Sequence, residues 1–223
     1  MTFLSPTFII AVLIGLSVHE FAHGYIALKL GDSTAKMDNR VSLNPLVHLD
    51  PIGTLMFFVI GFGWAKPVPI DPRYFKNVKR DTTLVALAGP AANLITAFLC
   101  FFLMLVLFEW NSTSAIGLLG GSGGSSTIMI MLERILNRCI FVNLALMAFN
   151  LLPINPLDGS KILYAFIPLR YEREYLEFMA RGPIILLGLI IAGMVFNIPI
   201  LSTWVFGIMT PFLVIMNIIA GII

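Results

Sequence analysis

The chain has 223 residues, of which 58% are hydrophobic and 12% charged, and its formal net charge is +2. Its mean hydropathy is +0.94. Soluble globular proteins carry roughly 25% charged residues, so this sequence lacks the polar side chains that a water-exposed surface requires. The composition therefore excludes a soluble protein and indicates an all-α polytopic membrane protein. The small net charge gives no reason to expect nucleic acid as a partner.

Long apolar runs divide the chain into candidate membrane helices. A helix that crosses about 30 Å of hydrocarbon needs roughly 20 mainly apolar residues. Residues 3–28, 82–108 and 135–153 meet this requirement, and residues 182–223 contain two further spans, the first of them short, separated at Asn197-Ile198-Pro199. We expect a Gly- and Ser-rich external loop at 111–127. Residues 171–181 suit a short interfacial helix or a solvated connector equally well.

The segment 51–65 decides the orientation of the chain. It has only 15 uncharged residues, contains three glycines and begins with Pro51, so we prefer a re-entrant or interfacial segment over a crossing one. Twelve of the 14 Lys and Arg residues then share one side, with Arg134 and Arg138 opposite. Because basic loops face the cytoplasm, we expect the N-terminus outside, the C-terminus inside and five to six transmembrane helices.

One motif places metal-ligand chemistry inside the first span. His19-Glu20-Phe21-Ala22-His23 is an H-E-x-x-H pattern. Helix positions i and i+4 lie on one face, so both imidazoles can reach one zinc ion, and Glu20 borders that face where it can hold the water that zinc activates. A structural polar cluster is the alternative. Ionisable groups inside a span are costly, however, and are functional candidates by default, so we favour a zinc site.

A third ligand is needed, because catalytic zinc usually has three protein ligands and one open position. Asp158 follows the third span, in a stretch with prolines at 153 and 156. If the chain turns back there, Asp158 could point at the metal. Alternatively, Asp158 forms only a turn with Gly159. The spacing alone gives these two interpretations equal weight. His48 is a competitor, although a turn histidine bonded to Asp50 is the favoured interpretation.

Taken in order, these motifs resemble the site-2 protease family of intramembrane zinc metalloproteases. The residues that carry the resemblance are His19-Glu20-x-x-His23, Gly89-Pro90-x-x-Asn93 and Asn150-x-x-Pro153-x-x-Pro156-Leu157-Asp158-Gly159, and the segment 63–69 resembles one in small prokaryotic members. Together they cover residues 15–160. The resemblance implies that His19, His23 and Asp158 bind one zinc ion and that Glu20 is the general base.

The resemblance also carries over two asparagines, Asn93 and Asn150, as groups that line the site and contact substrate. Ordinary interhelical hydrogen bonding is the alternative for both. Asn143 lies two helical turns before Asn150 on the same face, and no motif assigns it a role.

The implied function is a zinc endopeptidase of a prokaryotic inner membrane, which cleaves membrane-protein substrates in or near their transmembrane segments. We treat residues 1–223 as one integral-membrane domain without a PDZ or CBS domain, with a catalytic core at about 3–160, C-terminal spans at about 182–223 and a site open to the cytoplasm. The glycines of 51–65 and Gly89-Pro90 are expected along the route of the substrate. A non-proteolytic zinc-binding scaffold or transporter, with His and Glu as an ion path, is the alternative. The sequence indicates no oligomeric state.

Overall fold

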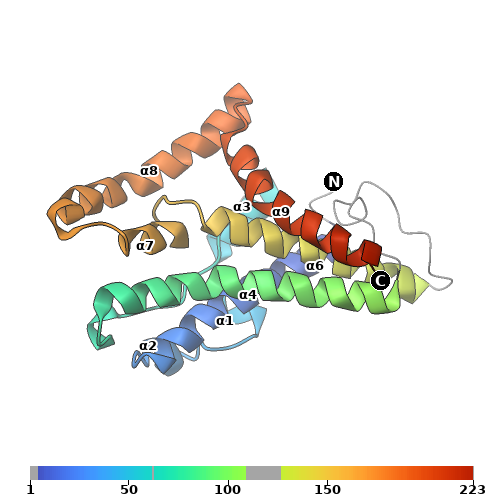
Figure 1. The fold of residues 1–223 in the computed structure, drawn as a ribbon, viewed down its shortest axis with the longest axis horizontal. Helices are drawn as coiled ribbons and strands as arrows, with labels where there is room; N and C mark the ends of the chain where they lie inside the picture. Colours follow the sequence, from blue (N-terminus) through green and yellow to red (C-terminus); the bar gives the residue numbers. More distant parts are fainter. Residues whose placement is uncertain (1–4, 62, 109–126, 223) are drawn as a thin grey trace.

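Within the described residues, five long helices build the fold, and Figure 1 shows their arrangement. The computed structural model describes residues 5–61, 63–108 and 127–222, and in these ranges the only extended pairing is a bridge between Leu49 and Ala65. The helices have 23 to 30 residues and are α1 (Pro6–Lys29), α4 (Val78–Leu107), α6 (Thr127–Asn150), α8 (Glu172–Phe196) and α9 (Ile200–Ile222). The expected all-α polytopic architecture is confirmed.

Four of these helices, α1, α4, α8 and α9, are long and apolar enough to cross a membrane. The fifth, α6, matches α1 in length but carries Glu133, Arg134 and Arg138 in its first half. The predicted runs at 3–28, 82–108 and 135–153 correspond to α1, α4 and α6. Residues 111–126 of the predicted external loop lie outside the described residues.

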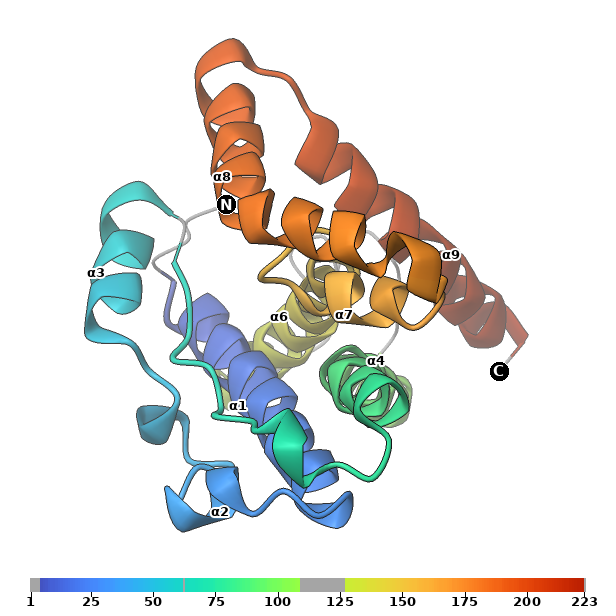
Figure 2. The same cartoon turned by 90° about the vertical axis from the view of Figure 1, so that its left-hand side faces the viewer.

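Helices α1, α4 and α6 lie side by side and form a three-helix core (Figures 1 and 2). Between α4 and α6 the buried side chains include Phe101, Met104, Ile140 and Leu144. The C-terminal ends of α1 and α6 and the N-terminal end of α4 meet at one end of this core (Figure 1). Segments from three distant parts of the sequence therefore lie together at this end of the core. The polar residues described below also lie there.

The segment 51–65 contains one short helix, α3 (Pro51–Ile60), of 10 residues. Its length of about 15 Å is half the hydrocarbon thickness. The Asp50 side chain accepts a hydrogen bond from Gly53 N at its start, and Gly61, with φ of 74°, ends it in the left-handed region. Local interactions thus define both ends of α3. The helix is too short to cross the membrane, which agrees with the preferred interpretation of this segment as re-entrant or interfacial.

Short elements join the long ones, and they are α2 (Thr34–Met37), η1 (Pro45–Val47), η2 (Pro72–Tyr74), α7 (Asp158–Tyr164) and η3 (Leu169–Tyr171). Phe75 is buried against Ala27 and Val85, at the end of the core where α1 ends and α4 begins. In contrast, Phe57 of α3 packs on Phe8 near the start of α1.

The C-terminal region differs from expectation at one boundary. Residues 172–181 are neither a separate interfacial helix nor a connector, because they are the first turns of α8, which runs 25 residues and so is not short. Tyr175 is buried and donates a hydrogen bond to the Ser160 carbonyl at 2.5 Å, so this part of α8 packs on α7 (Figure 2). The predicted break is confirmed, since Asn197 ends α8 with φ of 54° and α9 begins at Ile200.

Candidate metal centre and active site

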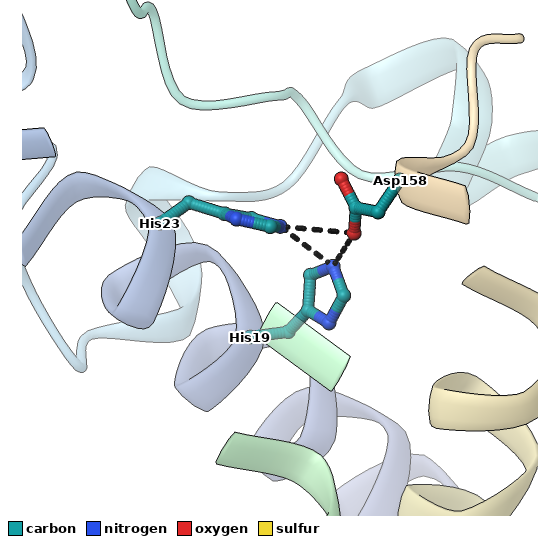
Figure 3. Close-up of side chains that lie close together, drawn as sticks. All are labelled: His19, His23 and Asp158. Atoms are coloured by element: carbon teal, nitrogen blue, oxygen red, sulfur yellow. Dashed lines mark hydrogen bonds and ion pairs between the residues drawn. The ribbon is translucent and has the colours of Figure 1, made fainter. Parts of the chain in front are cut away.

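Three buried side chains converge on one point at the end of the three-helix core (Figure 3). His19 Nε2 and His23 Nε2, one turn apart on α1, lie 2.9 Å from each other. Asp158 Oδ2, from the first residue of α7, lies 3.1 Å from His19 Nε2 and 3.2 Å from His23 Nε2. Only 5–7% of each residue is exposed, so bulk water cannot supply partners for these atoms.

This donor set fits a zinc ion. Ligand atoms 2.0–2.2 Å from a tetrahedral zinc lie about 3.3–3.6 Å from one another, and the three distances found here, 2.9, 3.1 and 3.2 Å, are slightly shorter. Asp158 Oδ2 is fully buried, yet no group in the described residues donates a hydrogen bond to it. Two imidazole lone pairs and a carboxylate oxygen that face each other repel unless a cation lies between them. His19, His23 and Asp158 can therefore hold a metal ion.

Helix α4 orients both imidazoles through their Nδ1 atoms, on the side of each ring away from the cluster. His23 Nδ1 lies 2.7 Å from the Val85 carbonyl oxygen, and His19 Nδ1 lies 2.6 Å from Asn93 Oδ1. Because both partners are oxygens that can only accept, each Nδ1 carries the proton and each Nε2 presents a lone pair to the centre. Such outer partners fix the ring orientation and tautomer of metal-binding histidines.

Gly89 of α4 is the residue that lets the two helices approach. A Cβ at this position would lie 2.5 Å from His19 Cε1 and 2.5 Å from His23 Nε2. Any other residue would displace an imidazole, since real Cβ contacts are longer. Gly89 thus packs against the two imidazoles, and its expected place along the substrate route stays a prediction.

The turn after α6 delivers Asp158. The chain reverses over residues 151–157, where Leu157 N donates to the Ile154 carbonyl at 2.9 Å, and α7 begins at Asp158 itself. From the other side, Gly182 of α8 packs so closely on this turn that a Cβ there would lie 2.5 Å from the Asn155 carbonyl oxygen. Lys161 Nζ lies 3.9 Å from the other carboxylate oxygen, Asp158 Oδ1. The position of Asp158 thus depends on α6, α7 and α8 together.

His48, the competing third ligand, lies apart from the cluster. Its Nε2 bonds to the Ser42 carbonyl at 2.7 Å, and the side chain is buried in the loop before α3. Its partner is therefore a backbone oxygen and not the expected Asp50. The group of potential ligands in the described residues contains Asp158 and not His48.

Glu20 lies beside the cluster and is held by an extended segment. Its Oε2 accepts a hydrogen bond from Val68 N at 2.8 Å, and 9% of the residue is exposed. The segment is itself anchored, because Arg40 Nη2 donates to the Lys66 carbonyl at 2.6 Å. Glu20 Oε1 accepts no hydrogen bond from the described residues. One carboxylate oxygen is thus fixed, and the other remains available for a proton.

The asparagines occupy three different places. Asn93 is completely buried, and its oxygen and both N–H groups bond to His19, Gly15 and Asn143. These are interhelical hydrogen bonds, and they leave no N–H group for a substrate. Asn150, at the end of α6, donates to the Leu146 carbonyl of its own helix at 3.0 Å. Asn143, to which no motif assigned a role, is completely buried beside Asn93, and its spacing from Asn150 was its only signal in the sequence.

An apolar pocket of about 530 Å³ opens between α1, α3 and α6. Its walls include Leu13 and Leu16 of α1, Phe57 of α3 and Leu146 of α6. Three glycines of the 51–65 segment, Gly53, Gly61 and Gly63, also line it. Leu16 lies one helical turn before Glu20, so the pocket extends along α1 toward the candidate metal centre.

The fold and this site define a membrane-embedded metalloprotein in which an H-E-x-x-H helix meets a distant aspartate. The sequence profile of Peptidase family M50 matches residues 7–192. The chain belongs to this family, the resemblance to site-2 proteases is confirmed, and the protein is a zinc metalloprotease.

Curated relatives carry names of the same kind. The chain is 37% identical over 188 residues to “Putative zinc metalloprotease YwhC” of Bacillus subtilis, covering 84% of this chain and 81% of the relative. It is 27% identical over 201 residues to “Putative zinc metalloprotease Rip2” of Mycobacterium tuberculosis, covering 88% and 68%. “Putative zinc metalloprotease MJ0611” of Methanocaldococcus jannaschii is 29% identical over 155 residues, covering 70% and 68%. No solved structure gives a significant match.

Proposed function

We propose that this protein is an intramembrane endopeptidase that hydrolyses peptide bonds in or near the membrane-spanning segments of other membrane proteins. In this proposal His19, His23 and Asp158 hold one zinc ion and Glu20 is the general base. The observation that carries it is the buried convergence of two imidazoles and a carboxylate beside a second carboxylate, at one end of a core in which α1 and α4 are long and apolar enough to cross a membrane.

The chemistry follows from how the residues are held. A zinc ion at this site supplies a Lewis acid that polarises a carbonyl oxygen and acidifies water. Glu20 accepts a proton at Oε1, the oxygen without a partner in the described residues, and returns it to the leaving amine. Val68 N–H keeps Oε2 in place throughout, because Pro67 and Pro69 on either side leave it as the only backbone donor of that stretch.

The apolar pocket supports a membrane-protein substrate. A backbone carbonyl within a helix is shielded by its own hydrogen bond, so a spanning segment must unwind locally before it can be cut. The walls of the pocket from α1, α3 and α6 are apolar, as the side chains of such a segment are. Of the three glycines that line it, Gly61 has no atom within 4 Å of a Cβ, whereas Gly53 and Gly63 pack closely on each other. We assign the pocket to the substrate.

The distribution of charge supports a site that opens to the cytoplasm of a prokaryotic cell, with the N-terminus outside. Lys29 ends α1, Lys79 lies in the first turn of α4, and Lys161 lies in α7, all at the end of the core that carries the cluster. Arg134 and Arg138 belong to the opposite half of α6. Lys/Arg-rich ends face the cytoplasm, which would also supply the water that a hydrolase needs.

The test uses the purified full chain in proteoliposomes with a single-span protein as substrate. Glu20→Gln should retain one zinc per chain and lower the cleavage rate by roughly 10²- to 10⁴-fold, the usual contribution of a general base. Glu133→Gln is the matched control, because Glu133 is also a buried glutamate of a long helix but belongs to the far half of α6. It should cleave at the unaltered rate.

Full cleavage by Glu20→Gln would remove Glu20 from the mechanism. A zinc chelator should stop cleavage by the unaltered chain, and added zinc should restore it. The scaffold or transporter alternative makes the opposite prediction, namely zinc binding or zinc flux across the vesicle with no cleavage at all.

A further inference from the structure

We propose that Asn93 and Asn143 form a directional chain of side-chain amides that selects the tautomer of His19 and holds its ring toward the metal. Both would then be positioning residues of the zinc site and not substrate contacts. The inference rests on the proposed function to the extent that His19 is a zinc ligand.

The chain crosses the whole three-helix core. Asn143 Nδ2, on α6, donates to the Cys139 carbonyl at 2.8 Å. Asn93 Nδ2, on α4, donates to Asn143 Oδ1 at 2.9 Å and to the Gly15 carbonyl of α1 at 3.0 Å. Asn93 Oδ1 lies 2.6 Å from His19 Nδ1. Both asparagines have 0% exposure, so no water competes for these bonds.

The backbone carbonyl acceptors fix which group donates and which accepts in every hydrogen bond of this chain of amides. The carbonyls of Cys139 and Gly15 can only accept, so Asn143 and Asn93 must turn their N–H groups toward them. The oxygen of Asn143 then faces Asn93, and the oxygen of Asn93 faces His19. His19 Nδ1 must therefore donate, which in the neutral imidazole leaves a lone pair on Nε2, the atom that faces His23 and Asp158.

Reversal of the Asn93 amide would be costly. It would place its oxygen against two other oxygens, Gly15 O and Asn143 Oδ1, in a fully buried position where an unpaired polar group is expensive. It would also turn N–H groups toward His19 Nδ1, forcing that nitrogen to accept and moving its proton to Nε2. A protonated Nε2 cannot bind a metal ion, so the Asn143 contact protects the ligand function of His19.

The two histidines thus depend on different supports. His23 Nδ1 bonds directly to a backbone carbonyl, that of Val85, which cannot flip. His19 instead bonds to the side chain of Asn93, whose orientation in turn depends on Asn143. Substitution of an asparagine should therefore weaken zinc binding through His19 alone.

The experiment measures the zinc affinity of the purified full chain by competition with a chelator, together with the visible absorption of its Co²⁺ form. Loss of an outer partner typically weakens metal binding 10- to 100-fold, and we expect roughly this loss for Asn93→Leu and about fivefold for Asn143→Leu, one hydrogen bond further away. The Co²⁺ absorption should shift in Asn93→Leu.

Asn137→Leu is the matched control. Asn137 is a buried asparagine on the same helix as Asn143, about 9 Å away along the axis, and its oxygen has no hydrogen-bond partner in the part of the chain that the structure describes. It should bind zinc as the unaltered chain does. If Asn93→Leu does not fold, Asn143→Leu carries the test, because it leaves the Asn93 bonds to His19 and Gly15 in place.

Zinc affinity of Asn143→Leu equal to that of Asn137→Leu would overturn the proposal, as would a Co²⁺ absorption of Asn93→Leu identical to that of the unaltered chain. These results differ from a failure of the proposed function. In that case the unaltered chain would bind no zinc or cleave no substrate, whatever the asparagine variants do.

Discussion

The three-helix core and the C-terminal pair α8–α9 consist of helices of similar length but bury different kinds of side chain. In the core, buried positions include polar side chains such as Glu20, Asn93 and Asn143, each with a partner on a neighbouring element. In α9 the fully buried side chains are Met209 and Met216, and both are apolar. A polar residue in a membrane helix is tolerated where another helix satisfies it. The inward faces of the core therefore carry the chemistry, while α8 and α9 contribute apolar surface.

The two regions share an apolar interface, in which Met209 and Met216 of α9 lie in the same buried cluster as Ile140 and Leu144 of α6. Two specific contacts decide whether the C-terminal pair is a passive anchor. Gly182 of α8 packs on Asn155, three residues before Asp158. Trp204 of α9 donates from Nε1 to the Ala148 carbonyl of α6 at 2.8 Å. Glycine substitutions test these contacts well, because they add a single methyl group at a known place.

The largest effect is expected for Gly89→Ala compared with Gly188→Ala. The methyl group at 89 would overlap both imidazoles, whereas a Cβ at 188 on α8 meets nothing within 4 Å. Overpacking costs about 1–3 kcal/mol, so zinc affinity should fall roughly 10- to 100-fold in Gly89→Ala. Gly188→Ala should bind and cleave normally. Chelator competition measures the difference, and equal affinities would show that α4 does not press on the site.

A smaller effect is expected for Gly182→Ala. Its methyl group would meet the backbone of Asn155 and shift the turn that carries Asp158. We expect cleavage to fall about tenfold, at the lower part of the overpacking range, with a smaller loss of zinc affinity. Gly193→Ala on the same helix is the control, since its nearest neighbour, Ile198 O, would be 3.6 Å from the Cβ. If both variants cleave alike, α8 has no part in positioning Asp158.

The smallest effect is expected for Trp204→Phe. The change removes one hydrogen bond between α9 and α6, which contributes about 1 kcal/mol to the free energy of unfolding. Unfolding in denaturing detergent should detect this loss, while zinc affinity and cleavage stay the same. Ser202→Ala, which removes only an exposed bond to the Pro199 carbonyl, should unfold as the unaltered chain does. A lower cleavage rate for Trp204→Phe would contradict the view that the three-helix core carries the chemistry and that α9 serves only as an anchor.

Much of the architecture could be predicted from the sequence because it depends on local patterns. Apolar runs of sufficient length located the long helices, and Asn197-Ile198-Pro199 located the end of α8. The length of α8 was not predictable in this way. Its first ten residues are mixed in polarity, and tertiary contacts such as the hydrogen bond of Tyr175 to Ser160 and its stacking on Tyr164 show that they pack on α7.

The sequence by itself determined the membrane class and the pairing of His19 with His23, because hydropathy and the 3.6-residue helical period act over one turn or one span. Spacing alone could not decide whether Asp158 is a ligand, and only the family resemblance selected it over His48. The sequence also could not show that Gly89 lies against the imidazoles or that Asn143 supports Asn93. Those relations depend on the rotation and axial position of helices that are far apart in the chain. Only tertiary packing sets these quantities, since no local preference encodes which face of α4 meets which face of α1.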